Sequence, residues 1–191
     1  MGFLDALLGR RKVAGPAKHD RLFAMSTAYV TLETSFDVRP SGVAGLVFQP
    51  QATGDFAQIV SDMEEVVRST GEETGTTLSS SDDQFGYRWM VLRDSDVEDL
   101  VVGVNAISEA LQTGGYGDRL LCAVFGFQDA TRQRVYFIYN YKRGSWYPFV
   151  PSGGEQQRSV ERELQLKAQI GGELPIEPEL ERWFPLWGVP I

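Results

Sequence analysis

The stretch from residue 119 to residue 151 constrains the fold most, because it predicts three consecutive antiparallel β-strands. Residues 119–128 are apolar at nearly every position, so both faces of this strand are apolar and we expect it at the centre of a sheet. Residues 134–141 are rich in aromatic and β-branched side chains, which suit a pleated, half-buried surface. Pro148 lacks the N–H that a β-ladder requires, so the third strand, residues 145–150, is expected at an edge.

Alternation along the first two strands assigns each side chain to a face of the sheet. In the first strand we expect Leu121, Ala123, Phe125 and Phe127 on one face and Leu120, Cys122 and Val124 on the other. In the second strand we expect Val135, Phe137, Tyr139 and Tyr141 opposite Tyr136, Ile138 and Asn140. Gly126 indicates a bulge or a close approach by another backbone segment, with a ligand as the alternative.

The first half of the chain predicts two helices and the strand between them. Apolar residues recur at helical spacing from residue 22 to residue 36, with Asp20 as a possible N-cap, although a strand at 29–32 remains an alternative. A turn at 40–42 is expected to precede a strand at 43–49. The clearest helix is expected to have Asp55 as its N-cap and to end at Gly71. Its apolar stripe is Phe56, Ile59, Val60, Met63, Val66 and Val67.

A hairpin and a further helix are predicted before the three strands at 119–151, which we call the meander. Residues 76–81 fit an edge strand, and residues 86–93 fit a second strand with Tyr87, Trp89 and Val91 on one face. Ser95 and Glu98 have capping-box spacing, which predicts a helix that runs to residues 114–115.

After the meander, the pattern predicts a peripheral helix and a docked tail. Ser152 and Glu155 repeat the capping-box spacing, so a helix is expected from there to residue 170. Its expected apolar stripe is Val160, Leu164 and Ala168, with an ion pair from Glu163 to Lys167. Prolines exclude a long helix in residues 173–191, whose aromatic side chains either dock on the sheet or, if exposed, mark a partner site.

These elements predict an α+β fold in the order α-β-α-β-β-α-β-β-β-α. We expect an antiparallel sheet of about five or six strands with helices packed mainly on one face. The expected organisation is an N-terminal arm and linker at 1–19, one α+β domain at 20–172 and the tail at 173–191.

Composition excludes several classes of function. The formal net charge is −8, and phosphate backbones repel such a surface, so we expect no nucleic-acid partner. The chain has one cysteine, Cys122, and one histidine, His19, which are too few for most metal sites and for most pairs of nucleophile and base. Because a single cysteine cannot form a disulfide within the chain, we expect a reducing compartment. Neighbouring carboxylates such as Asp82 and Asp83 diverge in a strand. We therefore expect no enzyme activity, no metal and no cofactor.

The N-terminal arm is amphipathic. Its apolar residues on one side of a helix are Phe3, Leu4, Leu7 and Leu8, and its basic residues are Arg10, Arg11 and Lys12. The arm either contacts protein, on its own domain or on a neighbour, or inserts at an anionic membrane surface. No run in the chain approaches the ~20 apolar residues of a membrane span.

Partner-binding candidates lie at the arm, the aromatic edge strand and the tail. The candidates outside the arm are Arg143, Trp146, Tyr147, Trp183, Phe184 and Trp187. The basic turn at 142–145 can grip a phosphate or a carboxylate, yet such a turn is also ordinary at a hairpin tip.

Four segments in order carry a family resemblance: MGFLDALLGR at 1–10, YKRGSWYPF at 141–149, LPIEP at 174–178 and RWFPLWG at 182–188. Together they resemble the PspA-associated protein PspAB family, which is found chiefly in actinobacteria. The resemblance implies a cytoplasmic protein encoded near a phage-shock protein A homologue, often with a membrane metalloprotease of the HtpX type nearby. It implies a role in envelope stress and carries over no catalytic residue.

The leading hypothesis is a non-enzymatic accessory of the phage-shock response that binds a PspA-type protein or another envelope-stress component. The alternative is a secretion-chaperone-like homodimer that holds a client protein, by analogy of fold order alone.

Overall fold

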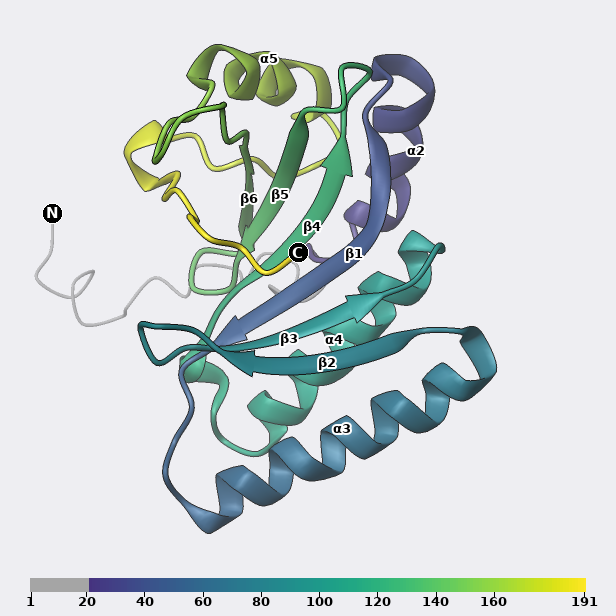
Figure 1. The fold of residues 1–191 in the computed structure, drawn as a ribbon, viewed down its shortest axis with the longest axis vertical. Helices are drawn as coiled ribbons and strands as arrows, with labels where there is room; N and C mark the ends of the chain where they lie inside the picture. Colours follow the sequence, from purple (N-terminus) through teal and green to yellow (C-terminus); the bar gives the residue numbers. More distant parts are fainter. Residues whose placement is uncertain (1–20) are drawn as a thin grey trace, which may run out of the picture.

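The computed structural model describes residues 21–191, in which six antiparallel strands form one sheet in the order β2-β3-β1-β4-β5-β6 (Figure 1). The strands are β1 (Arg39–Phe48), β2 (Thr77–Asp82), β3 (Arg88–Arg93), β4 (Leu120–Gln128), β5 (Arg134–Asn140) and β6 (Ser145–Phe149). The helices are α2 (Met25–Phe36), α3 (Gly54–Thr74), α4 (Val97–Thr113) and α5 (Val160–Ile170). The predicted fold class and element order are confirmed.

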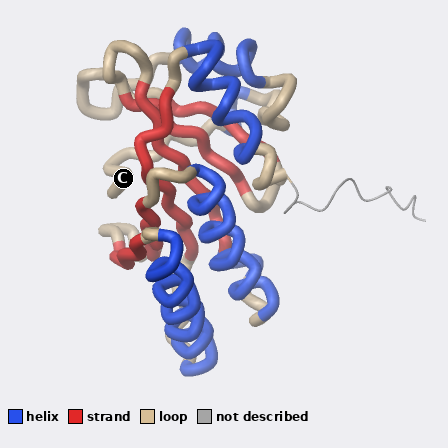
Figure 2. The backbone as a smooth tube through the Cα atoms, turned by 90° about the vertical axis from the view of Figure 1, so that its right-hand side faces the viewer, coloured by secondary structure: helices blue, strands red, loops and turns tan. Residues whose placement is uncertain are grey.

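The sheet separates two hydrophobic clusters. The helices lie on one side of it and the C-terminal segment crosses the other (Figure 2). On the helix side, Leu46 of β1, Phe125 of β4 and Phe137 of β5 are buried together. On the opposite side, Val124 and Ile138 pack with Trp183 of the C-terminal segment. The central strand β4 therefore has both of its apolar faces buried, as predicted.

In the meander, most side chains lie on the predicted face of the sheet, and two side chains of β4 lie on the opposite face. In β5 every predicted apolar side chain lies on its expected face. In β4, Leu120 belongs to the helix-side cluster and Leu121 packs against the other cluster, which is the reverse of the prediction. The cause is a register shift, since β1 pairs Val47 with Cys122 but Phe48 with Leu120. One extra residue reverses the alternation on one side of a bulge.

The predicted turn at 40–42 is also wrong, because β1 begins at Arg39 and passes through it. The register with β4 shifts between Pro40 and Ala44, and Gly42 takes a φ of +71° within the irregularity. A Cβ atom on Gly126 would lie 2.5 Å from the Ser41 hydroxyl oxygen and 3.0 Å from the Val43 side chain, both in this irregular part of β1. Gly126 is therefore closely approached, as predicted, but most closely by side chains of β1 rather than by its backbone.

Residues 29–32 are helical within α2, so the alternative of a strand there is wrong, and Asp20 lies outside the described residues. In the next two helices, three boundaries differ from the prediction. Thr53, not Asp55, caps α3, and the helix continues past Gly71 to end before Gly75. Asp96, not Ser95, caps α4, because its carboxylate accepts the Glu98 N–H. A carboxylate next to the first turn serves as well as the predicted hydroxyl.

The last helix is shorter than predicted and presents a different face. Residues 152–159 form turns, so α5 begins at Val160 rather than after Ser152. Its buried residues are Glu163, Leu166 and Ile170, whereas the predicted stripe of Val160, Leu164 and Ala168 is exposed. Glu163 pairs with Arg158 instead of Lys167. A buried carboxylate held by an arginine thus decides which face of α5 is turned inward.

The edge position predicted for β6 is confirmed, and the chain covers that edge itself. The Trp146 N–H donates to the Pro175 carbonyl at 2.9 Å, and the Glu177 N–H donates to the Trp146 carbonyl at 2.8 Å. The opposite edge, β2, is polar, as predicted, and pairs with β3. Polar side chains on such an edge oppose aggregation.

Candidate functional site

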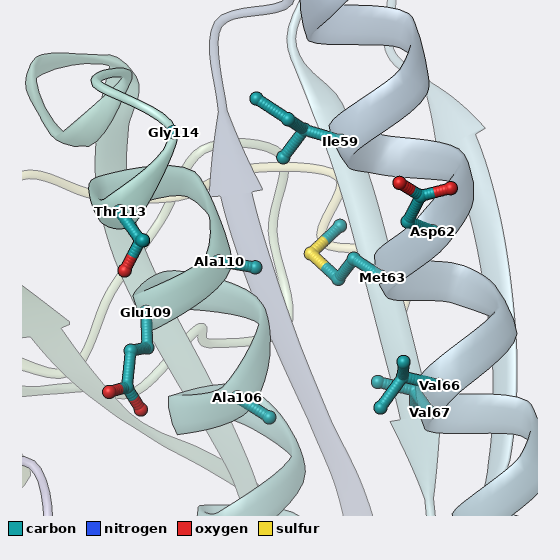
Figure 3. A pocket seen from close by; sticks show the side chains of 10 residues that line it. All are labelled: Ile59, Asp62, Met63, Val66, Val67, Ala106, Glu109, Ala110, Thr113 and Gly114. Carbon is teal, nitrogen blue, oxygen red and sulfur yellow. The ribbon is translucent and has the colours of Figure 1, made fainter.

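Helices α3 and α4 lie side by side on the helix side of the β2–β3–β1 half of the sheet and enclose a groove between them (Figures 1 and 3). The groove has a volume of about 580 Å³. Ile59 and Met63 project from α3 toward α4, and Ala106 and Ala110 project back from α4 (Figure 3). We call this feature the α3–α4 groove. Its lining residues are Ile59, Asp62, Met63, Val66, Val67, Ala106, Glu109, Ala110, Thr113 and Gly114.

Small residues on α4 create the hollow. Gly103, Ala106, Ala110 and Gly114 recur at intervals of three or four, so they share one face of the helix. At Gly114 the helices touch, because a Cβ atom there would overlap the Ile59 side chain. Between the glycines the two alanines are too short to fill the space beside α3. A gap therefore remains between two helices that are in contact at its end.

The groove continues toward the start of α4. A second hollow of about 100 Å³ shares Val66, Val67 and Ala106 with the first and adds Val102 and Gly103. Val66 is 60% exposed and Val102 is 56% exposed, which is unusual for valine side chains on two neighbouring helices. The exposed apolar surface thus follows the helices for several turns.

Helix α3 is held firmly enough to form a fixed wall. The Thr53 hydroxyl accepts the Phe56 N–H at 3.4 Å, and the Phe56 ring packs edge-on against Tyr116, with ring centroids 4.9 Å apart. The inward row of α3, including Phe56 and Val60, is buried in the helix-side cluster. Met63 and Val67 belong to the same cluster and also line the groove, so side chains that anchor α3 form part of the lining.

Three carboxylates lie at the apolar lining: Asp62 and Glu109 in the main hollow and Asp99 in the second. The two helices carry further acidic residues away from the lining, which are Asp55, Glu64, Glu65, Glu72, Glu73 and Glu98. Arg68 is the one basic residue in these two helices, and it lies 3.8 Å from Glu64. Burial raises the pKa of Asp99, and the neighbouring carboxylates of Asp94 and Asp96 raise it further. The rim therefore carries a concentrated negative potential that favours a cationic ligand.

This chemistry suits binding. An apolar groove between helices with a charged rim accepts an amphipathic helix, whose anchors recur at helical spacing. Within residues 21–191 there is no group of three histidine, cysteine or acidic side chains placed to hold a metal ion. Desolvation by burial raises the pKa of Cys122 to about 12, so the only thiol is not a nucleophile near neutral pH.

The candidate residues at the edge strand differ in their exposure to solvent. Arg143 is exposed at the turn between β5 and β6. Trp146 is fully buried and Tyr147 is 3% exposed, so neither offers a surface to a partner in this structure. The Trp146 indole N–H donates to the Arg21 carbonyl at 2.9 Å, so this side chain links β6 to the segment before α2. The arm candidates Phe3, Leu4, Leu7 and Leu8 lie outside the described residues.

The tail candidates are also divided. Trp183 is 4% exposed, lies nearly parallel to Tyr147 at 6.3 Å between ring centroids, and donates its indole N–H to the Glu177 carbonyl. Trp187 is partly buried against Phe149. Phe184 is 57% exposed, so of these three aromatic side chains it is the one that stays open to a partner. The tail therefore docks on the sheet through Trp183 and Trp187 and leaves Phe184 at the surface.

The α3–α4 groove was not anticipated from the sequence. Ile59 and Val66 were assigned to a buried stripe, although six apolar positions make a stripe wider than one sheet can cover. The second signal was the run of small residues on α4, which allows a neighbouring helix to leave a gap. Neither signal alone distinguishes a groove from ordinary helix packing.

Comparison with known proteins yields one match. No curated protein and no solved structure is significantly similar to this chain. Within residues 21–191, no helix is both long and apolar enough to cross a bilayer. The family described as PspAB, PspA associated protein B, matches residues 1–191.

Proposed function

The chain belongs to the PspA associated protein B family, and we propose that it is a cytoplasmic, non-enzymatic accessory that binds a PspA-type protein in the bacterial envelope-stress response. The observation that carries this proposal is the α3–α4 groove, an exposed apolar channel with an acidic rim. The family description names an association, and the groove is the surface best suited to one.

The groove defines the chemistry of the segment that it would take. Exposed valines and short alanines favour the apolar face of a helix, and the surrounding carboxylates favour lysine or arginine beside that face. Burial of one aliphatic side chain contributes about 1.5–3 kcal/mol. Four such anchors contribute about 6–12 kcal/mol, and association costs about 4 kcal/mol or more, so the apolar contacts alone give weak binding and the carboxylates at the rim must add to it.

A non-enzymatic role is supported by the lining of the groove. Its titratable members are Asp62 and Glu109, which project from different helices at the rim. The Asp62 carboxylate accepts a hydrogen bond from Gln58 on its own helix at 2.6 Å. The lining otherwise consists of aliphatic, threonine and glycine residues, which bind but do not transfer protons.

The test measures the dissociation constant between the purified full chain and the PspA-type protein of the same bacterium. Val66→Arg places a cation and a bulky side chain in the groove, and we expect it to weaken binding about tenfold or more. Val160→Arg is the matched control, since Val160 is also an exposed helical valine, 50% exposed on α5. Equal weakening by both variants, or by neither, would refute the groove as the binding site.

A further inference from the structure

The α3–α4 groove lacks a basic, amphipathic ligand within residues 21–191, and the same chain encodes one outside them. In the segment 3–12, four apolar residues fall on one side of a helix and three consecutive basic residues follow. The apolar side matches the exposed lining of the groove, and the cations match its acidic rim. Complementarity in both properties is what distinguishes this segment from the acidic remainder of the chain.

The sizes of the two surfaces agree. Ile59 to Val67 is the part of α3 that lines the groove, and at ~1.5 Å per residue it extends about 12 Å. A helix from Phe3 to Lys12 would extend about 14 Å on the same basis. Phe3, Leu4, Leu7 and Leu8 would therefore fit along the length of the lining.

Eight residues join the arm to the described part of the chain, which begins beside an element that contacts the groove. The described chain begins at Arg21, which is fixed by a hydrogen bond from its guanidinium to the Gly144 carbonyl at 3.1 Å and by the Trp146 indole. Helix α2 follows and packs against α4, one wall of the groove. Residues 13–20 can extend about 28 Å at ~3.5 Å per residue.

Tethering compensates for a short helix. A helix of this length is marginal alone in water. A covalent tether of eight residues raises the local concentration of the segment to about the millimolar range. An intrinsic dissociation constant near ~0.1 mM would therefore keep the groove about nine-tenths occupied.

We infer that residues 3–12 of this chain occupy its own α3–α4 groove when no partner is bound. This contact lies in the groove to which the proposed function assigns the partner, but it does not itself need a partner.

The contact is tested by thiol labelling of the full chain carrying Val66→Cys. The native thiol, Cys122, is buried and does not compete for the reagent. We expect labelling at position 66 to be about tenfold slower in the full chain than in a chain that also carries Leu4→Asp and Leu7→Asp. Val160→Cys is the control, and its labelling rate should be the same in both backgrounds.

Equal rates at position 66 in the two backgrounds would overturn the inference. Protection that grows with protein concentration would also overturn it, since the occupant would then be the arm of a second copy. Both results leave the partner assay untouched, so failure of the arm contact is distinguishable from failure of the proposed function.

Discussion

Arg158 Nη2 lies 2.8 Å from a carboxylate oxygen of Glu163, whose side chain is only 1% exposed. The same carboxylate accepts the Val150 N–H at 2.8 Å, and Arg158 also donates to the Trp183 carbonyl at 2.7 Å. One ion pair therefore joins α5, the end of β6 and the C-terminal segment.

Replacement of Glu163 by glutamine should destabilise the fold strongly. The neutral amide leaves Arg158, whose side chain is 19% exposed, as a poorly compensated charge, and such changes cost about 3–5 kcal/mol. Urea unfolding measures the difference in the free energy of unfolding. Glu161→Gln, on the exposed side of the same helix, should change it by less than about 0.5 kcal/mol. Similar values for the two variants would contradict a structural role for the pair.

The tail offers two adjacent aromatic residues with opposite expected effects. Trp183→Ala removes a buried ring that packs against Tyr147, and should lower the free energy of unfolding by about 3–5 kcal/mol. Phe184→Ala removes an exposed ring and should cost less than about 0.5 kcal/mol. Thermal or chemical unfolding of the two variants checks this. A small effect at Trp183 would mean that the tail is not part of the folded unit.

Gly71 is a helical glycine that alanine should not improve. Alanine within a helix is ordinarily favoured over glycine by about 1 kcal/mol. A Cβ atom on Gly71 would overlap the Thr76 carbonyl oxygen, which is backbone, so α3 or the start of β2 must move. We expect Gly71→Ala to lower the unfolding midpoint in urea. Gly54→Ala in the first turn of α3, where no atom lies within 4 Å of the added carbon, should leave the midpoint unchanged or raise it.

The buried thiol predicts a defined pH dependence. Burial raises the pKa of Cys122 from 9.0 to about 12, so the folded state favours the neutral thiol. Its contribution to stability is complete below the unfolded pKa of 9.0 and is lost as the pH rises toward 12. The difference in unfolding free energy between the native chain and Cys122→Ala should therefore shrink over this interval. A constant difference would place the thiol in contact with solvent.

The sheet was predictable from sequence because its signals are local and redundant. Val135, Phe137 and Tyr139 alternate over an unbroken strand, and Pro148 marks an edge regardless of context. The bulge that turns Leu121 to the other face depends on pairing with β1, and no local pattern reveals it. The face of α5 depends on Arg158, which lies outside the helix, so periodicity alone selected the wrong stripe.

The candidate site was less predictable for a similar reason. Val66 reads as a core residue in a helical stripe, and only the position of α4 shows that it is exposed. The residues most conspicuous in the sequence, Trp146 and Trp183, are buried within the fold and offer no surface to a partner. Large aromatic side chains indicate burial more reliably than they indicate recognition.

Hydrogen–deuterium exchange of the full chain, with and without the PspA-type protein, tests the central claim most directly. The account predicts slower exchange on binding in peptides that cover 54–74 and 97–113, and no change across 160–170. Protection confined to α5 or to the tail, with α3 and α4 unchanged, would contradict it.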